Sequence, residues 1–173
     1  MADPKTIVVV ADCHIHPPKI DWPPAALQAM AGADLIVTLG DMGEASGLAA
    51  LQAIAPVIGV RGEDDQTENP PLRVVEAGAV RLGCVFDPVA HGLAASKSPF
   101  VASDTATAAE ARAFGGPVDV LLCASTHSAE INAAGGRLTV DPGSVTLPTP
   151  GGKATFARLD LSGPKPSATI VEF

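Results

Sequence analysis

The chain is poor in aromatic side chains: among its 173 residues are five phenylalanines, one tryptophan and no tyrosine. Much of its 47% apolar content is alanine and valine, so the core must be built from small aliphatic side chains. That apolar fraction excludes a disordered chain. We expect a single domain over residues 1–173, because this length suits one hydrophobic core rather than two.

Basic residues are also scarce. Lysine and arginine total 11 against 19 aspartates and glutamates, which gives a formal net charge of −8. A polyanion-binding surface needs clustered lysine and arginine, so nucleic acid is not expected as the main partner. A small phosphorylated ligand stays possible, because a bound divalent cation can reverse the local field.

The chain has few cysteines and no long apolar run. Cys13, Cys84 and Cys123 are an odd number without the spacing of a disulfide framework, which indicates a reducing compartment. No apolar run approaches the roughly 20 residues that span a bilayer. No signal-peptide pattern follows Met1. We therefore expect a cytoplasmic protein without a membrane partner.

Short apolar runs alternate with helix-forming segments in the first part of the chain. Runs at 7–10, 35–39 and 57–60 predict buried strands, and the intervening segments 25–30 and 44–54 predict helices. This order predicts a parallel sheet with right-handed crossovers. Residues 14–24 hold four prolines and the single tryptophan. They predict an irregular loop whose tryptophan either contacts a partner or packs beneath the loop.

The later part of the chain predicts hairpins and one further helix. Glycine-containing turns separate short alternating segments, which is typical of antiparallel pairs. A loop rich in serine and alanine is expected at 91–105, followed by a helix at 105–114 that ends at two glycines. The expected strands lie at 72–76, 80–86, 118–123, 130–133, 137–140, 153–161 and 167–173.

Metal-ligand residues follow four of the predicted buried strands. Loops at the carboxyl ends of parallel strands converge on one crevice, so residues far apart in sequence can meet there. Carboxylate and imidazole groups together suit Mn, Fe, Zn or Ni. The four clusters are Asp12-Cys13-His14, Gly40-Asp41, Gly62-Glu63-Asp64-Asp65 and Ala124-Ser125-Thr126-His127.

Each cluster has an ordinary structural explanation when it is considered alone. Asp41 precedes a predicted helix and could cap it, and a run of three acidic residues usually forms a solvated face. A single histidine such as His127 is more often structural. Four clusters of matching chemistry at four strand ends are not expected by accident, so the sequence predicts a divalent-metal site. Cys13 should turn away from this site into the core, as strand alternation requires.

The ordered set of motifs resembles that of the calcineurin-like metallophosphoesterases. The resemblance is to the small single-domain type, which includes bacterial phosphodiesterases and the phosphoesterase-like subunit of retromer. The family pattern runs D-x-H, G-D, G-N-x-D, a strand-end H-G, G-H-x-H and N-P-G-S. In the same order this chain has Asp12-Cys13-His14, Gly40-Asp41, Gly62-Glu63-Asp64-Asp65, Phe86-Asp87, Ala124-Ser125-Thr126-His127 and Asp141-Pro142-Gly143-Ser144.

The resemblance implies both a fold and a metal centre. The fold is of the α/β class, with two packed sheets flanked by helices in an α/β/β/α sandwich. The centre holds two metal ions about 3.5 Å apart, bridged by the carboxylate of Asp41. The ligands that the resemblance assigns to the first ion are all present: Asp12, His14, Asp41 and His127.

The second metal site departs from the family pattern. Its ligands, besides Asp41, fall at Glu63, Phe86 and Ser125. Phenylalanine cannot bind a metal and serine is a poor neutral ligand, so this site is degenerate. Glu63 is a carboxylate and is expected to compensate as a metal ligand.

Other polar side chains near the degenerate site are expected to contribute. Asp64, Asp65, Asp87 or His91 could lean into it. His91 lies five residues beyond the expected histidine, and a solvent-facing position explains it equally. His16 follows His14 by two residues and has the same two readings. The predicted substrate-binding residues are Ser125, His91 and His16.

These features predict a metal-dependent phosphoesterase. A metal-activated water would hydrolyse a small phosphorylated substrate, either a monoester or a diester. The predicted catalytic residues are Asp41, Asp64 and Asp65, with Asp64 placed to protonate the leaving group. Manganese is the expected cofactor, as one or two ions, with zinc, nickel or iron as alternatives. The main alternative is a catalytically inactive relative that serves as a scaffold for a protein partner; a general α/β binding module explains the ordered motifs poorly.

Overall fold

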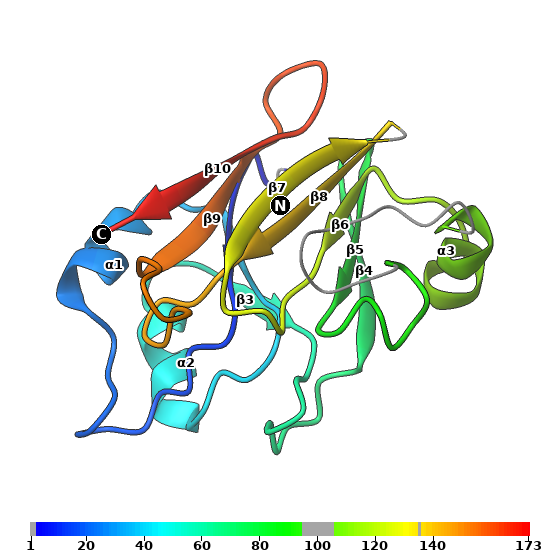
Figure 1. The fold of residues 1–173 in the computed structure, drawn as a ribbon. Coiled ribbons are helices and arrows are strands. Elements are labelled where there is room, and N and C mark those ends of the chain that lie inside the picture. Colours follow the sequence, from blue (N-terminus) through cyan, green and yellow to red (C-terminus); the bar gives the residue numbers. More distant parts are fainter. Residues whose placement is uncertain (1–2, 95–105, 135) are drawn as a thin grey trace.

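Two mixed β-sheets pack face to face in the computed structural model, which describes residues 3–94, 106–134 and 136–173 (Figure 1). Each sheet has five strands. The first consists, from edge to edge, of β10 (Ser167–Glu172), β9 (Thr155–Asp160), β1 (Thr6–Val10), β2 (Leu35–Thr38) and β3 (Val57–Gly59). The second consists of β4 (Leu72–Ala77), β5 (Val80–Val85), β6 (Val120–Leu122), β8 (Arg137–Pro142) and β7 (Ala129–Ala134).

In the described residues, three helices cover the outer faces of the two sheets. α1 (Pro24–Ala29) and α2 (Ala45–Gln52) pack on the first sheet, where Ala26 and Leu51 share a buried cluster with Val8. α3 (Ala106–Phe114) packs on the second sheet, where Phe114 is clustered with Leu121. The predicted α/β/β/α sandwich is therefore confirmed.

Strand β1 shows how the sequence specifies this layering. Ile7 and Val9 point into the core between the sheets, whereas Val8 and Val10 point toward the helices. All four side chains are fully buried. A central parallel strand is covered on both faces, which explains why its residues are apolar without interruption.

The strand register brings the carboxyl ends of the parallel strands to one edge. Val10 of β1 lies opposite Thr38 of β2, which in turn lies opposite Gly59 of β3. In the second sheet, Leu122 of β6 lies between Cys84 and Val140. The loops that follow these strands therefore emerge at the same end of the sandwich, as the sequence predicted.

The remaining expectations about local structure can be compared directly with the described residues. The predicted helix at 44–54 is shorter than expected, since α2 covers only Ala45–Gln52. Of the loop expected at 91–105, residues 95–105 lie outside the described residues.

Trp22 is 6% exposed and its indole N–H donates to the carbonyl of Gly47 at 2.9 Å, so it packs beneath the loop. The three cysteines are free and buried, and Cys13 points into the core as expected. In the part of the chain that the structure describes, no helix is long and apolar enough to cross a membrane.

Candidate metal centre

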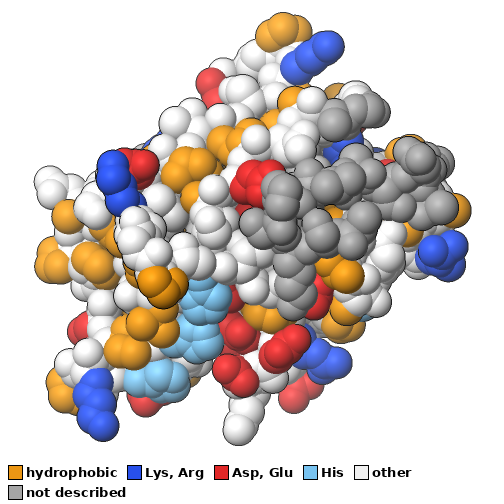
Figure 2. Space-filling model, in the orientation of Figure 1, with side chains coloured by type: hydrophobic (Ala, Val, Ile, Leu, Met, Phe, Trp, Pro, Cys, Tyr) orange, Lys and Arg blue, Asp and Glu red, His pale blue; other side chains and the backbone are white. Residues whose placement is uncertain are grey.

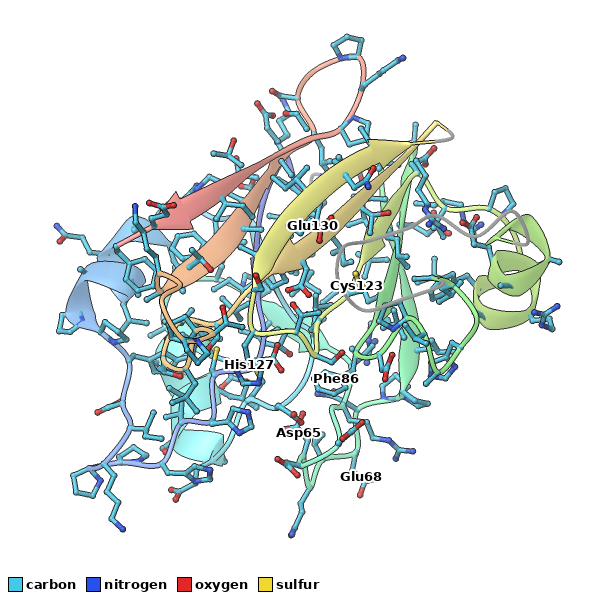
Figure 3. The ribbon with its side chains drawn as sticks, in the orientation of Figure 1. Asp65, Glu68, Phe86, Cys123, His127 and Glu130 are labelled. Carbon is cyan, nitrogen blue, oxygen red and sulfur yellow. The ribbon has the colours of Figure 1, made fainter. Side chains whose placement is uncertain are left out.

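Side chains from four strand-end loops meet at one end of the sandwich. His127, Phe86 and Asp65 lie there together although they come from distant parts of the sequence (Figure 3). On the surface, histidine side chains lie next to acidic ones at this end (Figure 2). A hollow of about 510 Å³ opens beside them, and its lining includes His14 and Asp41.

The backbone is unusual at the predicted ligands. A positive φ is costly for residues with a Cβ, although aspartate and histidine tolerate it better than most. Such outliers persist where surrounding structure holds them, and they cluster at functional sites. Among the described residues, the non-glycine positions with positive φ are Asp12 (50°), His14 (43°), Asp41 (51°), Ser125 (74°) and His127 (58°). All five belong to the predicted site.

Asp12 is a buried carboxylate with one satisfied oxygen. Its Oδ2 accepts a hydrogen bond from the backbone N–H of Ser125 at 3.2 Å. Its Oδ1 is buried without a hydrogen-bond partner among the described residues and lies 3.6 Å from Nε2 of His127. Burial raises the pKa of Asp12 to about 6, although the neighbouring His127 lowers it. A buried oxygen without a partner is costly, and a cation at this position would remove that cost.

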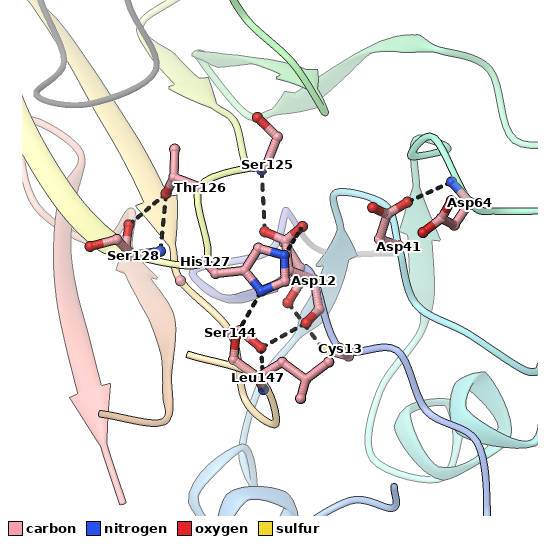
Figure 4. A network of polar contacts seen from close by, with 12 residues as sticks. Asp12, Cys13, Asp41, Asp64, Ser125, Thr126, His127, Ser128, Ser144 and Leu147 are labelled. Carbon is pink, nitrogen blue, oxygen red and sulfur yellow. Dashed lines mark hydrogen bonds and ion pairs between the residues drawn. The ribbon is translucent and has the colours of Figure 1, made fainter. Parts of the chain in front are cut away.

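His127 is oriented for metal binding by a contact behind it (Figure 4). Its Nδ1 lies 2.7 Å from the carbonyl oxygen of Leu147, which can only accept. Nδ1 therefore carries the proton in the neutral ring, and the lone pair of Nε2 faces Asp12. The ring also stacks on His14, with centroids 5.6 Å apart. Metal-binding histidines commonly have an outer partner of this kind.

Among the described residues, two groups of ligand atoms are close enough to hold an ion, and they share His14. Asp12, His14 and His127 form one group, with ligand atoms within 4.8 Å of one another. His14, Asp41 and Asp64 form the other, under the same limit. Carboxylate and imidazole ligands of this kind suit a divalent transition metal.

Asp41 lies against two glycines, Gly40 and Gly62, where a side chain on either glycine would not fit. It is 6% exposed, and its Oδ1 accepts the backbone N–H of Asp64 at 2.9 Å. Burial raises its pKa above the usual value. A Cβ at Gly62 would lie 2.1 Å from that same Oδ1, and one at Gly40 would lie 2.4 Å from the nitrogen of Gly62. These glycines therefore allow the two loops to approach closely.

Asp65 is bonded entirely to the backbone around Asp41. Its Oδ2 accepts the N–H groups of Asp41 and Gly62, both at 2.9 Å, and its Oδ1 accepts the N–H of Met42 at 3.0 Å. The contacts thus give Asp65 a positioning role beneath the site. The catalytic role predicted for it from the sequence stays a prediction.

The three positions of the degenerate half, Glu63, Phe86 and Ser125, do not belong to the two ligand groups, although the backbone of Ser125 contacts Asp12. Phe86 is buried, and so is the hydroxyl oxygen of Ser125, which has no hydrogen-bond partner in the part of the chain that the structure describes. Glu63 and His91 are exposed and line a different hollow of about 180 Å³, together with Phe86 and Asp87. Neither belongs to the two ligand groups, so the metal role predicted for Glu63 and the substrate role predicted for His91 remain predictions.

His16 lies closer to the centre. It lines the hollow of about 510 Å³ with His14, Asp41 and Asp64. Its Nδ1 is 3.4 Å from Oε1 of Glu44, and both side chains are exposed. This position is compatible with the substrate contact predicted for His16.

Sequence reasoning gave Ser144 no role beyond its turn, but the structure shows it holding the first ligand loop. Its buried hydroxyl donates to the carbonyl of Asp12 at 2.6 Å and accepts the N–H of Leu147 at 2.8 Å. The hydroxyl of Thr146 donates to the carbonyl of Cys13. The only sequence signal for this was the position of Ser144 in the D-P-G-S motif.

A buried aspartate connects the same turn to the loop of His127. Oδ2 of Asp141 accepts the hydroxyl of Thr126 at 2.7 Å, and Oδ1 accepts the N–H of Gly143 at 2.9 Å. Burial raises the pKa of Asp141 to about 7. The turn therefore positions ligands on two strand-end loops at once.

Fold and site together describe a two-sheet sandwich with a candidate divalent-metal centre at its strand ends. The chain matches the model of the calcineurin-like phosphoesterase superfamily domain over residues 6–163. This match covers most of the chain, which therefore belongs to the calcineurin-like phosphoesterase superfamily.

Relatives of known sequence agree with this assignment. The chain is 26% identical over 144 residues to a probable metallophosphoesterase of Methanocaldococcus jannaschii, covering 82% of this chain and 69% of the relative. It is 29% identical over 147 residues to a probable metallophosphoesterase of Methanothermobacter thermautotrophicus, covering 82% and 78%.

Solved structures support the fold. Vps29 of Chaetomium thermophilum superposes with a TM-score of 0.73 at 22% identity, covering 97% of this chain and 96% of that one. A conserved uncharacterized protein of Streptococcus pneumoniae, a predicted phosphoesterase, superposes with a TM-score of 0.68 at 16% identity, covering 99% and 91%. The expected resemblance to the calcineurin-like metallophosphoesterases is thus confirmed, and these small structures share the fold of this chain.

Proposed function

We propose that this chain is a metal-dependent phosphoesterase with one divalent ion bound by Asp12, His14, Asp41 and His127. The observation that carries this proposal is the buried Oδ1 of Asp12, which lacks a hydrogen-bond partner and lies 3.6 Å from Nε2 of His127. When bound, a divalent ion supplies Lewis acidity and lowers the pKa of a coordinated water. Family membership supports the same chemistry.

The residues around the ligands orient them for this task. The carbonyl of Leu147 fixes the His127 ring so that Nε2 faces the site. Asp65 holds the backbone of Asp41, and Ser144 holds the carbonyl of Asp12. Ligands held in this way need little reorganisation when an ion and a substrate bind.

The substrate in this proposal is a small phosphorylated molecule. The hollow of about 510 Å³ beside His14 and Asp41 offers it room, with His16 at the rim. Ser125 is proposed as a further substrate contact; its buried hydroxyl has no hydrogen-bond partner in the described structure and is free to bond to a ligand. Manganese remains our first choice of ion; zinc is a supported alternative, since Vps29 of Entamoeba histolytica has been solved with Zn²⁺. Three buried thiols fit a reducing compartment, for which we propose the cytoplasm.

A catalytically inactive scaffold is the second candidate function. The observation that favours it is the loss of two ligand positions, because Phe86 cannot bind a metal and Ser125 binds one poorly. In two-metal hydrolysis each ion stabilises a different oxygen, so a one-ion site should be slower. On this reading the ion site would be retained for structure and a protein partner would bind the surface.

The two functions are separated by hydrolysis of bis(p-nitrophenyl) phosphate by the Mn²⁺-loaded protein. The matched control is Asp41→Asn, because asparagine tolerates a positive φ and keeps an acceptor for the N–H of Asp64. Slow hydrolysis that requires Mn²⁺ and is lost in Asp41→Asn supports the enzyme. Equal rates in the two proteins, with Mn²⁺ bound to the wild type, support the scaffold.

A further inference from the structure

The three successive acidic residues after β3 face three different surroundings. Glu63 lines the hollow beside Phe86 and His91. Asp65 turns under the site and is bonded to backbone N–H groups. Asp64 alone faces the hollow that contains His14 and Asp41. Only one of the three is therefore placed to share an ion with the proposed ligands.

The distances agree with this placement. One ligand atom of Asp64 lies within 4.8 Å of ligand atoms of both His14 and Asp41. Two ligands of one ion, each about 2.0–2.2 Å away, are separated by at most roughly 4.4 Å. The separations of Asp64 from His14 and Asp41 thus require only small side-chain adjustments. Figure 4 shows the Asp64 and Asp41 side chains next to each other.

The backbone of Asp64 is fixed relative to the site. Its N–H donates to Oδ1 of Asp41 at 2.9 Å, and the Asp65 carboxylate holds the same turn through the N–H of Gly62. A side chain attached to a fixed backbone can reach an ion at low entropic cost. Asp64 is exposed, so no packing opposes this movement.

An independent observation points to a cation at the same place. Asp12 is fully buried, and its Oδ1 has no hydrogen-bond partner within residues 3–94, 106–134 and 136–173. Asp12 belongs to one ligand group and Asp64 to the other, and the two groups share His14. An unpaired buried carboxylate oxygen next to an imidazole ring is stabilised by a positive partner such as a divalent ion.

We propose that Asp64 is a fifth protein ligand of the single ion held by Asp12, His14, Asp41 and His127. This inference rests on the proposed function, because it adds a ligand to that ion. It differs from the family pattern, which places a ligand at Glu63 and none at Asp64. A metal-bound carboxylate is deprotonated, so Asp64 would not protonate a leaving group.

The proposal is tested by titrating the metal-free chain with MnCl₂ in a calorimeter. The matched pair is Asp64→Asn and Glu63→Gln, since each removes one exposed charge from adjacent positions. Loss of an inner ligand should weaken Mn²⁺ binding by at least the roughly 10-fold seen for outer-shell partners. Glu63→Gln should stay within about twofold of the wild type, as a surface substitution does. Asp41→Asn serves as the control that loses the ion site.

A spectroscopic measurement separates ligation from simple charge attraction. Loading with Co²⁺ should give a ligand-field absorption that changes shape in Asp64→Asn and is unchanged in Glu63→Gln. Equal Mn²⁺ affinity in Asp64→Asn and the wild type, with binding lost in Asp41→Asn, overturns the role of Asp64 but leaves the proposed ion site intact. Weaker binding in Glu63→Gln alone would instead assign the ligand to the family position. A wild type that binds no Mn²⁺ overturns both proposals.

Discussion

Replacing Asp65 with asparagine removes the charge that holds the acidic loop under Asp41. The carboxylate accepts three backbone N–H groups, from Asp41, Met42 and Gly62. Asparagine has one acceptor oxygen, which can still serve the two N–H groups that now share Oδ2. Its amide nitrogen would then face the N–H of Met42, where two donors meet without an acceptor.

The size of the effect follows from these contacts. A hydrogen bond to a charged group contributes about 1.5–3 kcal/mol, and a partly buried donor left unpaired costs about 1–3 kcal/mol. Because Asp65 is only half-buried, we expect Asp65→Asn to lower the free energy of unfolding by about 2–4 kcal/mol. Asp64→Asn should change it by less than about 0.5 kcal/mol, since that carboxylate is exposed.

Urea unfolding of the metal-free proteins measures this difference. With a slope of about 1–3 kcal/mol per molar urea, the midpoint of Asp65→Asn should fall by roughly 1–2 M. The midpoint of Asp64→Asn should match the wild type. Similar midpoints for the two variants would refute the positioning role of Asp65 and return it to the catalytic candidates.

Two further predictions concern pH and loop packing. Burial raises the carboxyl pKa of Asp12 to about 6 and of Asp141 to about 7, so the folded chain binds these protons more tightly than the unfolded chain. The metal-free protein should therefore lose stability as pH rises from about 4 to about 7. Calorimetry should give a higher Tm at about pH 5 than at about pH 8. A Tm that rises between these two pH values would contradict the burial argument. Gly62→Ala places a Cβ 2.1 Å from Oδ1 of Asp41 and should cost about 1–3 kcal/mol of stability. Gly163→Ala, whose Cβ would meet nothing nearer than 3.6 Å, is the control, and equal unfolding midpoints would argue against the close approach of the two loops.

The layered fold could be predicted from the sequence because it depends on local, periodic patterns of apolar residues. The uninterrupted apolar run at Ile7–Val10 needs burial on both faces, and only a central strand between a second sheet and helices provides it. The same logic placed Asp12, Asp41 and His127 at neighbouring strand ends. Helix ends were less predictable, since α2 stops at Gln52 although the apolar pattern continues.

Other parts of the site could not be predicted because they depend on the direction of single side chains. Glu63, Asp64 and Asp65 are chemically alike and adjacent, and only the backbone of their turn sends them to three different surroundings. The contact between Ser144 and the carbonyl of Asp12 joins residues 132 apart in sequence, so no local pattern could reveal it.

The left-handed backbone at five site residues has a consequence for protein engineering. Glycine avoids the roughly 1–2 kcal/mol that an L-residue loses in this conformation. His127→Gly would therefore remove an imidazole while relieving its backbone, whereas His127→Ala would remove the imidazole and keep the strain. Selecting variants for heat resistance alone should thus tend to replace the metal-binding side chains at these positions. At these five positions, a substitution that raises thermal stability of the metal-free protein would therefore weaken ion binding.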